Sequence, residues 1–312
     1  MLNLNSKIFV AGHNGLLGSS ICRVFKKNGY KNLIMKEKKD LDLNNKSMVD
    51  FFFNKERPDF IILAAGKTGG ILENKTNPLG LILNNLEIQT NVMSVAIKYK
   101  VNKLLFFGST CMYPSSLLMP LEESMLLSGK PEISSLPYAI AKLSGVQLSL
   151  AYNFQANKNI FLPLIPNSIY GPNDNFDHNS GHVLSSLLNK FHDAKVNNLN
   201  EVTLWGTGVS KREFVYVDDL SEACLLILKK NTSNIEFPIN IGSGEEISIL
   251  DLAKKISKIV NFKGNIIWDE TKPEGVKRKF LSSNRIKDIG WEPKVNIDNG
   301  LKLTYKWYLN NN

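Results

Sequence analysis

Short apolar segments alternate with amphipathic segments along the first 165 residues of the chain. Residues 8–11, 31–35, 59–65, 103–108 and 159–165 are apolar runs of strand length. Between them, apolar residues recur at helical spacing, as in Leu17, Ile21, Val24 and Phe25. Alternating strands and helices are typical of a parallel sheet that is covered on both faces. The pattern therefore predicts an α/β fold with a doubly wound parallel sheet.

The remainder of the chain is less regular. Polar loops surround one amphipathic helix in residues 173–210, and residues 212–217 form an apolar strand. Asp218 and Asp219 are expected to cap the next helix, which runs to Lys230. Residues 237–242, 250–260 and 265–268 predict a strand, a helix and a strand of a smaller α/β domain. We expect a nucleotide-binding domain over 1–165, to which a segment near 212–240 returns, and a substrate-binding domain over 166–312.

Composition narrows the function classes. No apolar run approaches the roughly 20 residues of a membrane span, and the N-terminus lacks a secretory segment. Three widely spaced cysteines predict neither a disulfide framework nor a metal site, and favour a reducing cytoplasm. His178 and His182 have the spacing of a metal pair but lack the accompanying Glu, so we expect no metal. The net charge of +9 favours anionic small molecules, because no nucleic-acid-binding motif is present.

A glycine-rich loop follows the first strand. Residues 12–18 read G-x-x-G-x-x-G, and the next helix begins within them. Glycines at this place allow a tight turn, so that backbone N–H groups approach a pyrophosphate at the helix N-terminus. The strand, loop and helix together predict a Rossmann-type dinucleotide site.

The second strand ends in a charged cluster, residues 36–39, which holds three lysines and Glu37. Basic residues here suit the 2′-phosphate of NADP, whereas an acidic residue suits the ribose of NAD. The lysines favour NADP, Glu37 leaves NAD open, and a solvated charge cluster without a ligand is a third interpretation.

Candidate reduction chemistry lies in residues 108–142. Tyr138 and Lys142 are four residues apart, so they share one face of a helix that Pro137 can begin. A nearby ammonium favours phenolate, which would make Tyr138 a general acid or base near neutral pH. Ser109 ends a buried strand and is expected to reach the same substrate carbonyl. The set resembles the catalytic triad of short-chain dehydrogenases/reductases, although the spacing alone also fits an ordinary surface helix.

Further motifs make the resemblance more specific. They are the segments at residues 11–15, 67–71, 108–114, 138–142, 170–176, 182–183, 205–208 and 212–214. Through these segments the chain resembles, over nearly its whole length, the GDP-L-fucose synthase family of extended short-chain dehydrogenases/reductases. The resemblance implies epimerisation of a GDP-4-keto-6-deoxy sugar at C3 and C5, followed by reduction of C4 with NADPH.

The resemblance also implies a role for each matching residue. Cys111 would be the general base and His182 the general acid of epimerisation. Tyr138 would donate the proton to O4, Lys142 would lower the Tyr138 pKa and bind the nicotinamide ribose, and Ser109 would orient the keto oxygen.

The implied cofactor contacts are Gly12, Asn14, Gly15, Leu16, Leu17, Gly18, Lys38, Asp42, Leu43, Ala64, Ala65, Gly66, Lys142, Pro166, Asn167, Ile169 and His182. The implied substrate contacts are Ser109, Thr110, Cys111, Asn167, Val183, Lys190, Trp205, Arg212 and Lys279.

Four expectations rest on local physics. If the strand continues past Ser109, Cys111 points to the same face as Ser109. The alternative interpretation of Cys111 is an inert buried thiol. His182 opens a helix, which would keep its pKa near or below neutrality. Trp205 packs either on a base or sugar or in the core. Residues 272–279 form either a loop that closes over the nucleotide or an ordinary surface loop.

Three residues depart from the family pattern, in which Arg is common at their positions: Lys190, Asn14 and Lys38. Lys190 stands where Arg is usual and cannot form a bidentate phosphate contact. Asn14 removes one positive charge from the expected NADP phosphate site.

Several alternatives stay open at this point. Relatives with this architecture make GDP-linked deoxyheptoses or colitose, and some reduce C4 without epimerising. A regulatory protein that binds NADP without turnover is a non-enzymatic alternative. The resemblance implies a homodimer formed by the helix at 84–100 and the helix that carries Tyr138.

Overall fold

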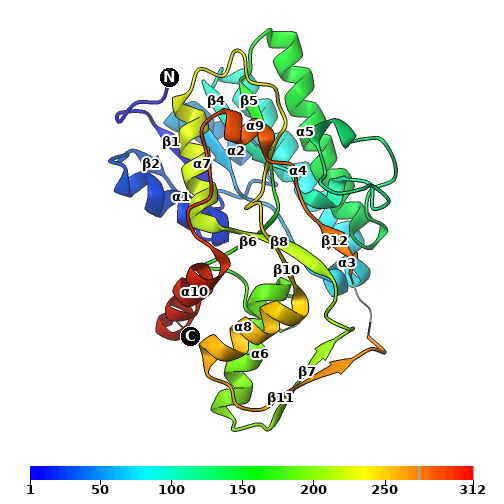
Figure 1. Ribbon diagram of the computed structural model, residues 1–312. Coiled ribbons are helices and arrows are strands. Elements are labelled where there is room, and N and C mark those ends of the chain that lie inside the picture. Colours follow the sequence, from blue (N-terminus) through cyan, green and yellow to red (C-terminus); the bar gives the residue numbers. More distant parts are fainter. Residues whose placement is uncertain (179, 273–274, 312) are drawn as a thin grey trace.

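The structure, a computed structural model, describes residues 1–178, 180–272 and 275–311. Its centre is a sheet of six strands in the order β2-β1-β3-β4-β5-β9 (Figure 1). Every neighbouring pair in it is parallel. The strands are β1 Ile8–Ala11, β2 Leu33–Ile34, β3 Phe60–Leu63, β4 Lys103–Phe107, β5 Phe161–Pro166 and β9 Ile239–Ile241. The predicted Rossmann-type parallel sheet is thus confirmed.

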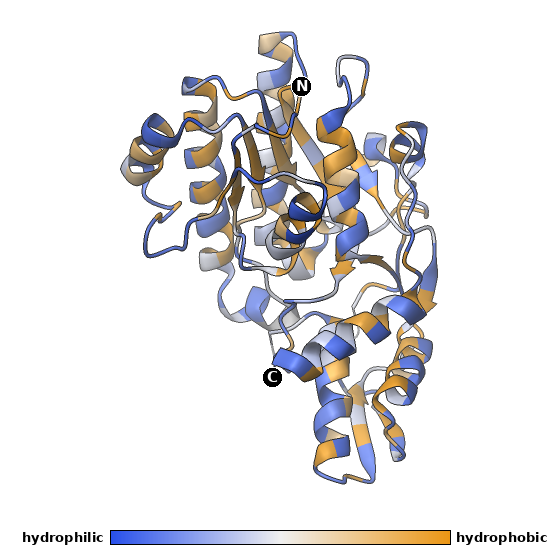
Figure 2. Cartoon of the chain, turned by 90° about the vertical axis from the view of Figure 1, so that its left-hand side faces the viewer, coloured by the Kyte–Doolittle hydropathy of each residue, from blue (hydrophilic) through white to orange (hydrophobic). Residues whose placement is uncertain are grey.

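Helices cover both faces of this sheet, as its almost uniformly apolar strands require. Alternate residues of β1 show the two-sided burial: Ile8 and Val10 belong to one core cluster, Phe9 and Ala11 to the other. The first cluster lies under α1 Leu16–Lys27 and α7 Val217–Lys229. The second lies under α2 Lys46–Glu56, α4 Pro78–Lys98 and α5 Leu136–Ala156. In Figure 2 the central strands are orange and the helices around them carry blue, hydrophilic outer faces.

A smaller unit lies below the sheet in Figure 1 and has its own apolar core. Its strands are β6 Ser168–Tyr170, β7 Glu201–Trp205, β8 Lys211–Tyr216, β10 Glu246–Ser248, β11 Asn265–Asp269 and β12 Arg278–Lys279. Strand β8 is central, because β6, β10 and β12 all pair with it, while β7 pairs with β11. The helices are α6 Val183–Val196, α8 Ile249–Val260 and α10 Ile297–Asn311.

The remaining elements are short: α3 Ile71–Thr76, α9 Asn284–Asp288, and the 3-10 turns η1 Thr110–Met112, η2 Glu123–Met125 and η3 Ile133–Ser135. Among the described residues, no helix combines the length and the apolar character needed to cross a membrane.

Three expectations about the elements were wrong. The segment expected to complete the smaller domain at 237–242 instead supplies β9, the edge strand of the large sheet. The helix expected at 84–100 begins at Pro78, because the Asn77 side chain caps it by accepting a hydrogen bond from Gly80 N at 3.1 Å.

The third concerns the start of α7, where Tyr216 is the cap residue and both aspartates lie in the first turn. Asp219 is used elsewhere: its Oδ2 accepts hydrogen bonds from Lys294 N and Val295 N at 3.0 and 2.8 Å. It thereby ties the C-terminal segment to the returning helix.

Candidate functional site

The end of β4 and the start of α5 bring three predicted residues together. Pro137 lies in the first turn of α5, as expected, and Tyr138 and Lys142 follow on one face. The Lys142 Nζ lies 5.9 Å from the Tyr138 ring centre and 5.1 Å from that of Phe106. The Ser109 side chain is a hydrogen-bond partner of the Tyr138 hydroxyl. Serine, tyrosine and lysine thus form one cluster at the carboxyl edge of the sheet.

The protonation states in this cluster differ from the expectation that Lys142 lowers the Tyr138 pKa. Burial raises the pKa of Tyr138, the neighbouring Cys111 raises it further, and only the Ser109 hydrogen bond opposes the shift. Burial lowers the pKa of Lys142 to about 8. The physical reason is that burial disfavours the charged form of each group.

Cys111 is placed by a turn rather than by a strand. Strand β4 ends at Phe107, and residues 110–112 form the 3-10 turn η1, so the expected strand continuation was wrong. Ser109 caps this turn, because its Oγ accepts a hydrogen bond from Cys111 N at 3.3 Å. Cys111 is partly exposed, and Lys279 Nζ lies 3.6 Å from its Sγ. Thr110 lies beside it in the turn and is buried.

His182 reaches the site region from the smaller unit. It is the cap residue of α6, as expected, and its Nδ1 lies 3.8 Å from Asp174 Oδ1. The Asp174 side chain is only 4% exposed, so its charge is poorly screened. The nearby Asp174 carboxylate raises the pKa of His182 above its ordinary value, although burial opposes this shift.

A cavity of about 430 Å³ lies along the glycine-rich loop. Among the predicted cofactor contacts, it is lined by Gly12, Asn14, Gly15, Lys38, Asp42, Leu43, Ala65 and Gly66. Leu16, Leu17 and Gly18 form the first turn of α1, Ala64 follows β3, Pro166 ends β5, and Ile169 lies in β6.

Close backbone approach explains the glycines of this loop. Gly12 has φ +81°, and a Cβ there would lie 2.7 Å from Ala65 N. A Cβ on Gly18 would lie 2.1 Å from Gly12 O, so the loop could not pack on α1. The resulting cradle at the N-terminus of α1 fits a dinucleotide pyrophosphate.

Several residues of this cavity are not among the individually predicted cofactor contacts. His13, Lys36, Lys67, Asn84 and Ile88 also line it. Lys36 belongs to the charged cluster at 36–39, which the sequence already associated with the 2′-phosphate of NADP. Lys39 Nζ lies 2.9 Å from Glu37 Oε2, which offsets the one acidic charge of the cluster.

Lys190 and Trp205 face each other at the edge of the smaller unit. The Lys190 Nζ lies 5.7 Å from the Trp205 ring centre, and Trp205 is 51% exposed. The interpretation of Trp205 as a core aromatic is therefore wrong. Val183 is the first residue of α6 and is also exposed, whereas Arg212 lies in β8.

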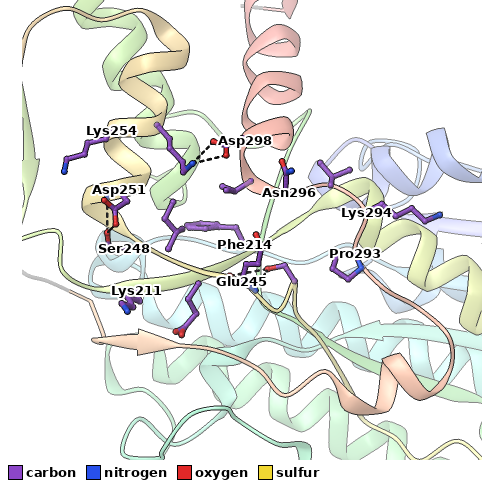
Figure 3. Close-up of a pocket in the computed structure, with 16 residues that line it drawn as sticks. Lys211, Phe214, Glu245, Ser248, Asp251, Lys254, Pro293, Lys294, Asn296 and Asp298 are labelled. Carbon is purple, nitrogen blue, oxygen red and sulfur yellow. Dashed lines mark hydrogen bonds and ion pairs between the residues drawn. The ribbon is translucent and has the colours of Figure 1, made fainter.

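A larger cavity of about 720 Å³ lies between α8 and α10 (Figure 3). Lys211, Phe214, Asp251 and Asp298 are among its lining residues, and Lys255 pairs with Asp298 at 2.7 Å. None of the predicted site residues lines it. Its volume alone does not make it the reaction site.

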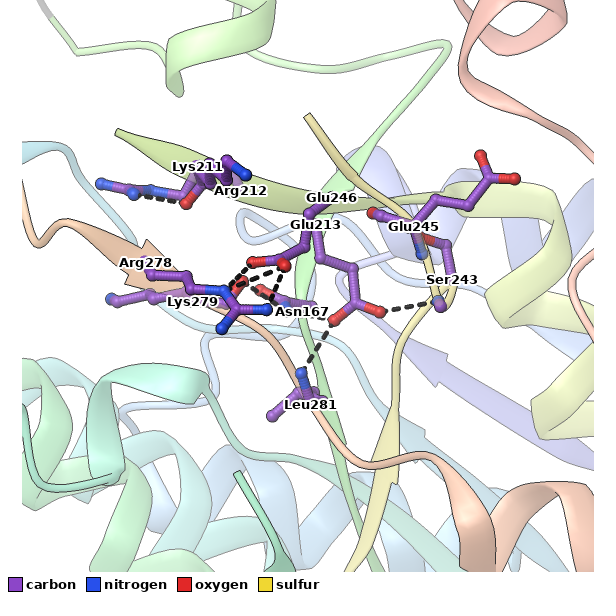
Figure 4. A network of polar contacts seen from close by, with 11 residues as sticks. Asn167, Lys211, Arg212, Glu213, Ser243, Glu245, Glu246, Arg278, Lys279 and Leu281 are labelled. Carbon is purple, nitrogen blue, oxygen red and sulfur yellow. Dashed lines mark hydrogen bonds and ion pairs between the residues drawn. The ribbon is translucent and has the colours of Figure 1, made fainter. Parts of the chain in front are cut away.

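A buried carboxylate joins the two units at β8 (Figure 4). Glu213 is fully buried, which raises its pKa, and it accepts hydrogen bonds from Gly244 N at 2.7 Å and Leu281 N at 3.1 Å. The Asn167 side chain donates a hydrogen bond to the same carboxylate. Its contact with cofactor and substrate stays a prediction. The sequence reasoning missed Glu213, because its importance depends on partners that are distant along the chain.

The expected closing loop is described only in part. Pro273 and Glu274 lie outside the described residues. The part that follows, β12, pairs in parallel with β8, and Arg278 forms an ion pair with Glu246. Lys279 is thereby held in the sheet beside Cys111.

Comparison with known proteins agrees with this site. The model of the NAD dependent epimerase/dehydratase family matches residues 8–242. GDP-L-fucose synthase 1 of Arabidopsis thaliana is 45% identical over 311 residues, which cover 100% of this chain and 95% of the relative. GDP-L-fucose synthase of Escherichia coli K12 is 38% identical, covering 98% and 97%.

The chain is also similar to solved structures of GDP-sugar reductases. A GDP-6-OMe-4-keto-L-xylo-heptose reductase from C. jejuni superimposes with a TM-score of 0.92 at 31% identity, covering 100% of this chain and 99% of that one. A GDP-mannoheptose C4 reductase from Campylobacter jejuni, with NADP bound, gives 0.90 at 32% identity, covering 99% and 100%. The chain therefore belongs to the NAD dependent epimerase/dehydratase family of extended short-chain dehydrogenases/reductases, and within it to the GDP-L-fucose synthase family.

Proposed function

We propose that this enzyme uses NADPH to reduce the C4 keto group of a GDP-4-keto-6-deoxy sugar and also epimerises C3 and C5. The observation that carries the proposal is the junction of two sets of groups at residues 109–111. Ser109, Tyr138 and Lys142, here called the reduction cluster, adjoin Cys111, one of the two acid–base groups; the other is His182. The full-length similarity to GDP-L-fucose synthases supports the sugar class.

The cavity along the glycine-rich loop suits NADP. The cradle around Gly12 and Gly18 accepts the pyrophosphate, and Lys36 and Lys38 offer positive charge to a 2′-phosphate. The bound cofactor supplies the hydride that is added to the carbonyl carbon. Lys142 would hold the nicotinamide ribose.

The reduction cluster handles the proton. As the carbonyl carbon gains its hydride, the oxygen becomes basic and takes a proton from the Tyr138 hydroxyl. A raised Tyr138 pKa keeps this hydroxyl protonated before the reaction. The Ser109 hydroxyl orients the oxygen, and the Lys142 ammonium stabilises the phenolate that remains.

Epimerisation uses the acidity that the C4 carbonyl gives to the hydrogens on C3 and C5. At each of the two carbons in turn, Cys111 would remove the proton, and His182 would return a proton to the opposite face. A raised His182 pKa suits this role, because it favours the protonated imidazole that a general acid needs.

The GDP moiety would lie against the smaller unit. Lys190 and Arg212 suit the diphosphate, and the half-exposed Trp205 offers an aromatic face to the base or sugar. Val183 and Thr110 would line the sugar site.

A second candidate function is C4 reduction alone on a GDP-linked heptose. The observation in its favour is the structural match to the two Campylobacter heptose reductases. An NADP-binding regulatory protein is a weaker candidate, because the reduction cluster is complete.

We also infer that the enzyme is a homodimer that works in the cytoplasm. Helices α4 and α5 expose apolar side chains, among them Leu79, Leu83 and Phe154, of which Phe154 is 90% exposed. A second copy would cover these side chains. The three free cysteines suit a reducing compartment.

One reaction in deuterated water tests the function. The protein, NADPH and GDP-4-keto-6-deoxy-mannose are mixed, and the product is identified by NMR. A fucose product with deuterium at C3 and C5 is expected. Reduction without deuterium would identify a C4 reductase, and no NADPH oxidation would direct the same test to 4-keto heptoses.

A further inference from the structure

Lys279 lies between the thiol of Cys111 and the carboxylate of Glu132. Its Nζ is 3.6 Å from Cys111 Sγ, and it also forms an ion pair with Glu132. The side chains of Lys279 and Glu132 are only 15% and 13% exposed. A buried ammonium at this distance favours the charged form of a thiol.

Glu132 holds this arrangement in two ways. Its backbone N–H donates to Cys111 O at 3.4 Å, and its carboxylate binds Lys279. Ser134 Oγ donates to the same carboxylate at 2.5 Å, which limits its movement. Glu132 therefore fixes both the turn that carries Cys111 and the cation that faces it.

Other charged groups face this arrangement from neighbouring elements. Arg212 in β8 acts on both Lys279 and Glu132, and Tyr138 in α5 acts on Cys111. Although burial opposes charge on both partners, the pKa of Lys279 is raised and that of Glu132 is lowered. Both residues are thus held in their charged forms.

We propose that Lys279 is the counter-ion that holds Cys111 as a thiolate, and that Glu132 is a positioning residue that fixes Lys279 there. This goes beyond the expected role of Lys279 as a substrate contact, and it assigns a role to Glu132. Its meaning for epimerisation rests on the function proposed above, whereas the charge state of Cys111 does not.

The chemical consequence is a base that is charged before the substrate arrives. The thiolate takes a proton from C3 or C5, and the electrons of the broken C–H bond form the C=C bond of an enolate whose charge lies on O4. The thiol formed in this step remains beside Lys279, which favours its return to thiolate.

The proposal is tested by alkylating the substrate-free protein with iodoacetamide. The rate of alkylation is measured on the Cys111 peptide by mass spectrometry from pH 5 to 10. The thiolate displaces iodide, so the rate follows the thiolate fraction. Cys22 and Cys224 are buried and are read on separate peptides. The variants are Lys279→Met, Lys279→Arg, Glu132→Ala and, as the matched control, the exposed Lys277→Met.

We expect Lys279→Met to move the alkylation midpoint upward by about one to three pH units. Lys279→Arg should keep it low, and Lys277→Met should match the wild type. Glu132→Ala should move it upward as well, because Lys279 loses its anchor.

An unchanged midpoint in Lys279→Met would overturn the counter-ion role. A downward shift in Glu132→Ala would show that the carboxylate only opposes the lysine charge, and would overturn the positioning role. Failure of the wild type to turn over any GDP-keto sugar, with these shifts intact, would refute the proposed function and leave this inference standing.

Discussion

The reduction cluster and the acid–base groups are built in different ways. Ser109, Tyr138 and Lys142 come from the end of one strand and the first two turns of the helix that packs beside it. Cys111 comes from a 3-10 turn, His182 from the start of α6, and the cation beside Cys111 from β12. The first set belongs to the large sheet and its helices, whereas the second is distributed over both units.

Under the proposed roles, reduction and epimerisation depend on different parts of the fold. Changes within the large sheet and its helices should affect reduction, and changes in how the smaller unit packs should affect epimerisation first.

The largest effect is expected from Tyr138→Phe. Without the phenol no group donates the proton to O4, so kcat for NADPH oxidation should fall by about 10²- to 10⁴-fold. Exchange of the C3 and C5 hydrogens in deuterated water should persist, as should NADPH binding. Tyr152→Phe on the same helix is the matched control, and equal loss of exchange and reduction would break the distinction.

Cys111→Ser and His182→Gln should show the reverse pattern. Hydrogen exchange at C3 and C5 should fall by about 100-fold or more, because proton transfer loses its base or its acid. Reduction of an already epimerised 4-keto sugar should change only a few-fold. NMR gives the exchange rate and NADPH absorbance the reduction rate, with His178→Gln as control. A parallel fall in both rates would mean that the two sets act as one.

Lys142→Met should lower activity, and it should raise the stability of the cofactor-free protein. Burial lowers the Lys142 pKa to about 8, so below this pH the folded state pays for a buried ammonium, a cost of about 3 kcal/mol. Above pH 8 the folded state loses its proton first, and the cost disappears as pH approaches the unfolded value of about 10.4.

Urea unfolding should therefore show a larger free energy of unfolding for Lys142→Met than for the wild type at pH 7. This difference should become smaller between pH 8 and 10. The exposed Lys130→Met serves as control. A variant that is less stable than wild type at pH 7 would show that the ammonium has stabilising partners in the folded protein.

Lys38→Met should weaken NADPH binding by about tenfold, the effect of losing one charge-assisted contact. Affinity for NADH should stay unchanged, because NADH has no 2′-phosphate. Calorimetry with both cofactors makes the comparison within one variant. Equal losses for the two would place Lys38 away from the phosphate.

The smallest effect is expected from Lys190→Arg. A guanidinium can bind the diphosphate through two hydrogen bonds, so affinity for GDP should rise by about threefold. Lys195→Arg on the exposed side of the same helix is the control. Unchanged GDP affinity in Lys190→Arg would exclude Lys190 from the diphosphate site.

Local patterns predicted the nucleotide-binding part well, for a physical reason. A buried parallel strand must be apolar throughout, and a pyrophosphate turn needs glycine where a Cβ would strike the backbone. Gly12 and Gly18 both meet this condition. The helical spacing of Tyr138 and Lys142 likewise placed them on one face without further information.

Charge states and long-range partners could not be predicted in this way. The pKa of His182 depends on Asp174, which is held beside it by a loop, and the pKa of Tyr138 depends on burial that no local pattern reports. Asp219 resembled a helix cap in the sequence but binds the backbone of residues 294 and 295.

The parallel sheet, the dinucleotide loop and the reduction cluster could therefore be predicted from the sequence alone, because each depends on residues that are close along the chain. Only the tertiary structure decided that β9 joins the large sheet, and that Lys279 and Glu132 meet at Cys111. Glu132 and Lys279 are 147 residues apart along the chain, so only the packing of β12 against the Cys111 turn brings these charges together.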